Sequence, residues 1–174
     1  MVFASGCATG VRPTDCKSAK VTSTAYQASH RIKSTASASS RYGVAVPLYR
    51  LRAAQSRVQH CTALTIRKEL WIERKDSSLS LTETREFFAE DGTLIARTTD
   101  DVSAQLPRTG GYEAKLEVPV PSGAPAGRYR LVSRLFALGL RGRAATLAQS
   151  DIEFVVEPHP RKSVTAPGAR KHAY

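Results

Sequence analysis

Apolar and polar residues alternate along much of the chain after residue 61. The first such segment, 64–73, has apolar residues at positions 64, 66, 70 and 72, interrupted only by Lys68. An extended strand places alternate side chains on one face, so this period predicts a half-buried β-strand. Similar patterns follow at 80–88, 93–102, 112–120, 128–137 and 144–156.

Short turn signals separate these segments. Glu90-Asp91-Gly92 lies between 80–88 and 93–102, and an Asp-Gly pair is typical of a tight hairpin. Six strands joined by turns, without a convincing amphipathic helix, predict an all-β fold: an antiparallel two-sheet sandwich.

Charge divides the 174-residue chain into three parts. Residues 1–60 carry nine basic groups and one acidic group, 61–156 carry thirteen of each, and 157–174 carry four against one. The net charge of +11 therefore belongs to the two ends. We predict a Ser/Ala-rich basic arm over 1–60, mostly disordered or extended, a β-sandwich domain over 61–157, and a basic flexible tail over 158–174. One apolar segment of the arm, 44–49, could lie along a sheet, where Pro47 would restrict it to an edge.

Proline and glycine residues lead into the strand expected at 128–137. The segment reads Pro119-Val120-Pro121 and, after a short gap, Ala124-Pro125-Ala126-Gly127-Arg128-Tyr129-Arg130-Leu131. It resembles bacterial immunoglobulin-like domains of the macroglobulin and fibronectin types. In those families a Pro-x-Gly-x-Tyr segment leads into a strand. The resemblance implies a turn at Gly127 and a tyrosine corner, with Tyr129 buried and its hydroxyl bonded to the backbone.

The N-terminal Ala4-Ser5-Gly6-Cys7 resembles a bacterial lipobox. The resemblance implies lipidation of Cys7. Only three residues precede the motif, so an export signal would begin upstream; otherwise the likeness is accidental. With Cys7 lipidated, Cys16 and Cys61 remain as a possible disulfide worth about 3–4 kcal/mol; the alternative is three free thiols.

A basic ridge is expected on the strand that contains Tyr129. On this strand the basic side chains alternate with apolar ones and so share the opposite face. The strand contributes Arg128, Arg130 and Arg134, and the following turn adds Arg141 and Arg143. The ridge could contact an acidic protein or phosphate groups. Alternatively, Glu113, Glu117 and Glu153 could pair with it and make a mixed-charge solvent face.

Candidate catalytic groups are few in the predicted sandwich. All four histidines lie in the arms or at their junction with it, and the cysteine spacing fits neither a zinc site nor a redox motif. The carboxylate pairs Glu90-Asp91 and Asp100-Asp101 could bind calcium but suit structural roles. We therefore expect no enzymatic activity, no metal and no cofactor.

Two functions fit these expectations. The first is a non-catalytic exported module, periplasmic or lipid-anchored in the outer membrane, that binds or spaces another protein or a larger assembly. The alternative is a nucleic-acid-associated structural protein, capsid-like or ribosome-like, that uses its basic arms.

Overall fold

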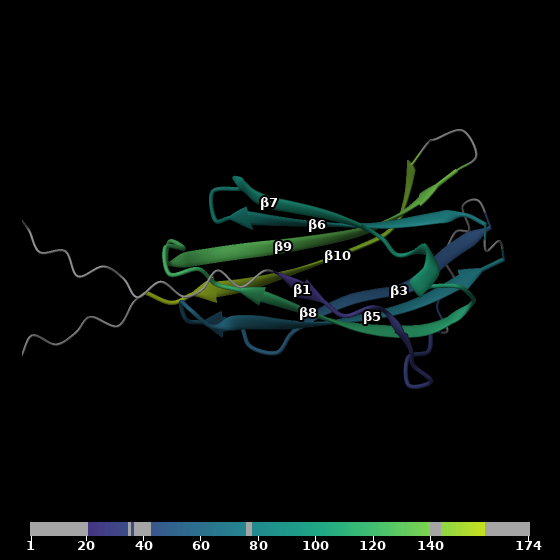
Figure 1. Cartoon of the computed structure of the whole chain (residues 1–174), viewed down its shortest axis with the longest axis horizontal. Helices are drawn as coiled ribbons and strands as arrows, with labels where there is room; N and C mark the ends of the chain where they lie inside the picture. The colour runs from purple at the N-terminus through teal and green to yellow at the C-terminus, as the bar shows by residue number, and fades with distance from the viewer. Residues whose placement is uncertain (1–20, 35, 37–42, 76–77, 140–143, 159–174) are drawn as a thin grey trace, which may run out of the picture.

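Two β-sheets pack face to face in the computed structural model, which describes residues 21–34, 36, 43–75, 78–139 and 144–158 (Figure 1). The first sheet has the order β1 (Thr22–Ser23), β8 (Gly110–Pro119), β5 (Ala63–Arg74) and β3 (Val44–Ala53), and β2 (Gln27–Ala28) also pairs with β8. The second has the order β4 (Arg57–Val58), β10 (Ala144–Val156), β9 (Gly127–Leu138), β6 (Ser80–Ala89) and β7 (Leu94–Asp101). A short 3₁₀ helix, Ser103–Gln105, follows β7. The predicted sandwich is confirmed, and its pairings are antiparallel except for β4 with β10.

The hairpin of β6 and β7 shows how local sequence sets the fold. Asp91 Oδ1 accepts a hydrogen bond from the Thr93 amide at 2.9 Å, and Gly92 has a φ of +83°. This left-handed backbone conformation carries no steric cost for glycine. The turn therefore forms where the Asp-Gly pair predicts it.

The sandwich includes more of the N-terminal part than the sequence analysis predicted. Residues 1–60 were expected to be mostly an arm, in which only 44–49 could lie along a sheet edge. Strand β3 does occupy the edge of the first sheet, but it extends to Ala53 and buries Val44, Val46 and Leu51. The register shifts between Ala45 and Leu48, around Pro47. A bulge at an edge accommodates a proline, whose backbone cannot donate a ladder hydrogen bond.

Residues 21–34 also pack against the sandwich. The Ser29 amide donates to the carbonyl of Gly111 at 2.8 Å. A Cβ atom at Gly111 would lie 2.2 Å from the carbonyl oxygen of Ile32. Only glycine permits this approach, so Gly111 allows the segment around Ile32 to lie directly against β8.

The space between the sheets contains two apolar clusters rather than one. The first has Leu70, Ile72 and Leu81 among its members. The second includes Leu64 and Ile66. Strand β5 contributes to both, and the position between its two apolar pairs is Lys68. A polar layer therefore separates the two halves of the core.

Candidate functional site

The polar layer consists of inward-pointing residues on three strands. Lys68 lies on β5, Glu83 and Arg85 on β6, and Ser133 on β9. The side chains of Lys68 and Glu83 are each 1% exposed. Burying a charge is costly unless it is paired and hydrogen-bonded, so these groups must satisfy one another.

Glu83 is the centre of the layer. Its Oε2 accepts a hydrogen bond from Lys68 Nζ at 2.8 Å. Its Oε1 accepts hydrogen bonds from the hydroxyls of Tyr49 at 2.6 Å and Tyr26 at 3.0 Å. Ser133 Oγ lies 3.2 Å from the same oxygen. Both carboxylate oxygens are thus bonded, which allows the charge to remain in the interior.

The surroundings shift the pKa values of the layer. Burial raises the pKa of Glu83, but the charge and hydrogen bond of Lys68, with the Tyr49 hydroxyl, outweigh it and hold the pKa below its ordinary value. Burial lowers the pKa of Lys68, opposed by Glu83. Burial and then neighbouring groups, Glu83 among them, raise the pKa of Tyr26 and of Tyr49 well above the ordinary value, so both phenols keep their protons and donate.

Arg85 connects the layer to the surface. Its Nη2 pairs with Asp100 of β7, and its Nε donates to Thr98 Oγ1 at 3.1 Å. Its Nη1 lies 3.8 Å from Glu83 Oε2 and has no hydrogen-bond partner among the described residues. No role for these groups was expected from the sequence; the available signal was Lys68, a charged residue in phase with apolar ones.

The predicted basic ridge is a mixed-charge face in the described residues. Arg128 lies 3.7 Å from Glu153, Arg134 pairs with Glu86, and the Arg130 guanidinium lies 5.5 Å from the centre of the Phe88 ring. Glu153 is one of the partners that the sequence suggests. Glu113 and Glu117 lie on β8 in the other sheet. Arg141 and Arg143 fall outside the described residues.

Glu86 is the partner that the sequence analysis missed. It lies opposite Val132 and Arg97 on the outer face of β6. Its carboxylate pairs with both Arg97 and Arg134. Burial by these side chains raises the pKa of Glu86, yet hydrogen bonds from Arg134 and Arg97 outweigh it and lower the pKa overall. Glu86 therefore neutralises the centre of this face.

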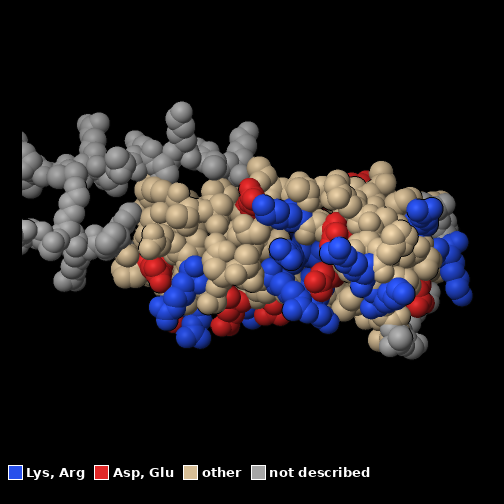
Figure 2. Space-filling view, turned by 90° about the horizontal axis from the view of Figure 1, so that it is seen from below, with Lys and Arg blue, Asp and Glu red and all other residues tan. Residues whose placement is uncertain are grey.

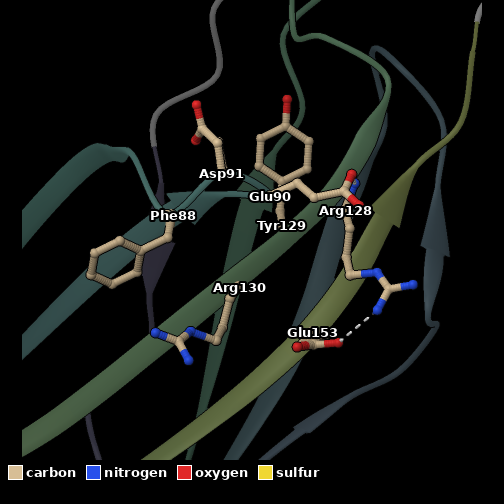
Figure 3. A pocket seen from close by; sticks show the side chains of 9 residues that line it. Phe88, Glu90, Asp91, Arg128, Tyr129, Arg130 and Glu153 are labelled. Carbon is tan, nitrogen blue, oxygen red and sulfur yellow. Dashed lines mark hydrogen bonds and ion pairs between the residues drawn. The ribbon is translucent and has the colours of Figure 1, made fainter.

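A hollow of about 340 Å³ lies at one end of the same sheet. The turn after β6 forms one side, and the first residues of β9 form the other; among the residues that line it are Phe88, Asp91, Arg128, Tyr129, Arg130 and Glu153 (Figure 3). Its walls combine two aromatic rings with charges of both signs.

Tyr129 stands third in β9. Its hydroxyl donates to the carbonyl oxygen of Pro125 at 2.6 Å, and its ring stacks on Phe154 with 5.7 Å between ring centres. The ring is half-buried, whereas the resemblance implies a buried one. Gly127, two residues earlier, has a φ of +153°.

Cys61 precedes β5 and is disulfide-bonded. Its φ of +62° is uncommon for a residue with a side chain. Cys7 and Cys16 lie outside the described residues. The lipidation of Cys7 and the pairing of Cys16 with Cys61 stay predictions.

The outer face of the first sheet mixes basic and acidic side chains (Figure 2). Arg52, Arg67 and Lys115 lie directly opposite one another on β3, β5 and β8. Arg52 also lies 3.5 Å from Glu69. Lys115 pairs with Glu117 of its own strand. Like charges opposite each other disfavour the pairing of strands, and these acidic neighbours offset part of that repulsion.

No group of three or more His, Cys, Asp or Glu in the described ranges could hold a metal ion. No helix in that part of the chain is long and apolar enough to cross a membrane.

Neither a protein family nor a curated protein matches the sequence. Among solved structures, the C-terminal domain of Wzt is similar with a TM-score of 0.49 and 14% identity over 68% of this chain and 75% of that one. A CARDB domain from Pyrococcus furiosus, described with di-metal ions, gives 0.39 and 10% identity over 66% and 92%. The DNA glycosylase AlkC of Pseudomonas fluorescens, bound to DNA, gives 0.39 and 11% identity over 68% and 32%. These likenesses concern the sandwich alone.

Proposed function

We propose that this chain is a non-catalytic exported module whose immunoglobulin-like sandwich binds or spaces another protein. The main observation in favour of export is the disulfide bond of Cys61. Disulfides persist mainly in oxidising compartments such as the bacterial periplasm. The lipobox-like segment before Cys7 agrees with a periplasmic or outer-membrane location, with the lipid as anchor.

The hollow of Figure 3 supports protein binding. Tyrosine, phenylalanine and arginine are the side chains enriched at protein interfaces. Here Phe88 and Arg130 lie opposite each other on β6 and β9, which are paired on both sides and so hold them in place, and Tyr129 also lines the hollow. Glu153 and Arg128 at the rim add charges that favour a partner of mixed polarity.

The interior supports a structural role for the ionisable groups. Glu83 is bonded to four side chains, and both tyrosine hydroxyls of the layer are committed to it. A carboxylate with so many fixed donors is poorly suited to proton transfer, because its pKa is held low. We infer that the polar layer serves to make the sandwich rigid.

Site-specific photo-crosslinking in the native cell tests the proposal. A photoreactive residue placed at Arg130, in the hollow, should give an adduct with one protein. The same residue at Lys115, on the outer face of the other sheet, is the matched control and should give none. We expect Phe88→Ser to reduce the adduct at position 130. Equal labelling at both positions, or no protein adduct, would contradict the proposal.

The row of Arg52, Arg67 and Lys115 favours the alternative, binding of nucleic acid with help from the basic ends. Binding of labelled DNA and RNA, measured against salt, separates the two functions. The proposed function predicts negligible affinity near physiological salt. Tight binding there, lost in Arg67→Glu or on removal of residues 1–20, would replace the first function by the second.

A further inference from the structure

Strand β7 leaves one edge of the second sheet open (Figure 1). Among the described strands it pairs with β6 alone. Its side chains are exposed almost throughout, and Leu94 and Ile95 are 44% and 55% exposed. These two are the most exposed large apolar residues of the described chain. An open edge of this kind is a template for another strand.

The backbone groups that face the open edge can be assigned. The Val102 amide donates to the carbonyl of Leu81 at 2.9 Å, directly beyond the last paired residues of the hairpin. In an antiparallel ladder, hydrogen-bonded and non-hydrogen-bonded pairs alternate. Counting back from Val102, the amides and carbonyls of Arg97, Thr99 and Asp101 point away from β6, toward solvent.

We propose that the open edge binds a second copy of this chain. The two β7 strands pair antiparallel about a two-fold axis at Thr99, which makes one continuous ten-stranded sheet. Arg97 of each copy then lies opposite Asp101 of the other. Thr99 lies opposite Thr99. The amides and carbonyls of all three residues point toward β7 of the second copy. Each residue therefore forms a hydrogen-bonded pair with the residue opposite it.

Charge selects this register among the alternatives. Centring the pair on Arg97 would place two arginines opposite each other, and centring it on Asp100 would do the same for two aspartates. A centre at Thr98 would leave Arg97 opposite Thr99 and Ile95 opposite Asp101. Only the centre at Thr99 gives two Arg97–Asp101 pairs. Opposite charges facing across strands are favourable, and like charges are not.

The rows of the second sheet continue across this interface. Within one copy, Arg97 already pairs with Glu86 of β6. The second copy adds its Asp101 on the other side of Arg97, so the charges along this row run negative, positive, negative. Thr84 Oγ1 lies 3.3 Å from Thr99 Oγ1, and the two-fold axis extends this into a row of four threonines. Because the two-fold axis uses the β7 edge of both copies, pairing there closes after two copies.

Sedimentation or light scattering of the full chain tests the proposal. We expect a concentration-dependent dimer. Thr99→Pro removes an amide that β6 does not use, so the fold should survive, as circular dichroism can check, while the dimer is lost. Asp101→Arg should weaken the dimer at least about tenfold, because two attractive pairs become repulsive. Asp151→Arg, on β10 of the same sheet, is the control and should not.

Three results would overturn the proposal. They are a wild-type monomer at the highest soluble concentration, a dimer that folded Thr99→Pro leaves intact, and a dimer equally sensitive to Asp101→Arg and Asp151→Arg. Should Thr99→Pro fail to fold, the two charge variants still decide. The readout is oligomeric state and is independent of the compartment and partner proposed above.

Discussion

Replacing Lys68 by methionine tests whether an ion pair holds the polar layer together. Methionine fills a similar volume but carries no charge, so Glu83 loses the ammonium group 2.8 Å from its Oε2. Removing one partner of a buried ion pair costs about 3–5 kcal/mol. Because Tyr26, Tyr49 and Ser133 still contact Oε1, we expect a loss near the lower end, about 3 kcal/mol.

The pH dependence of that loss identifies Glu83 as its source. In the wild type the folded pKa of Glu83 is below its ordinary value. Its contribution to stability is therefore present above the unfolded pKa of about 4.3 and is lost as pH falls through the folded pKa. Without Lys68, burial should raise the folded pKa. The deficit of Lys68→Met should then be largest at neutral pH and shrink on acidification.

Chemical denaturation of a double-mutant cycle supplies the measurement. The variants are Lys68→Met, Glu83→Met and both together, with Leu70→Met as a volume-conserving control that should cost less than about 1.5 kcal/mol. The double variant should be more stable than the sum of the single losses predicts, by about 2 kcal/mol. Additive single losses, or a Lys68→Met loss no larger than that of the control, would refute the reasoning.

The remaining predictions concern other parts of the domain. Tyr129→Phe should lower the free energy of unfolding by about 0.5–1.5 kcal/mol, since the bond to Pro125 is partly exposed; no change in denaturation would argue against the corner. Gly111→Ala should displace residues 21–34, detectable as faster amide hydrogen exchange in that segment, because its Cβ would overlap the Ile32 carbonyl. A chain reduced to residues 62–157 lacks β3 and should show no cooperative melting by circular dichroism. Reduction of the intact chain should destabilise it by about 2–5 kcal/mol, and identical melts with and without reductant would exclude a structural disulfide.

The sequence predicted best where structure depends on neighbours along the chain. The hairpin at Asp91-Gly92 and the alternating strands β5, β8, β9 and β10 were expected near their observed bounds. Strand β3 was harder, because the bulge at Pro47 shifts the register of the strand. Val44 and Val46 are buried before the bulge and Leu51 after it, so no single period of two runs through the strand.

The site depended on contacts between distant strands. Glu83 is in phase with Leu81 and Phe87, which marks it as inward-pointing once the strand is known. Its partner Lys68 is 15 positions away, and Tyr26 is 57 away. Alternation tells which face a residue occupies but not which residue it meets across the core. For the same reason the sequence could offer a mixed-charge face as an alternative to the ridge but could not name Glu86, which reaches Arg134 only through the pairing of β6 with β9.

The redox state of Cys61 in the native cell tests the central claim, an exported module, most directly. Cells are quenched in acid, free thiols are alkylated, and the protein is analysed by mass spectrometry with and without prior reduction. The account predicts that Cys61 is alkylated only after reduction, in protein recovered with the envelope fraction. A free Cys61 thiol in protein recovered with nucleic acid would contradict it.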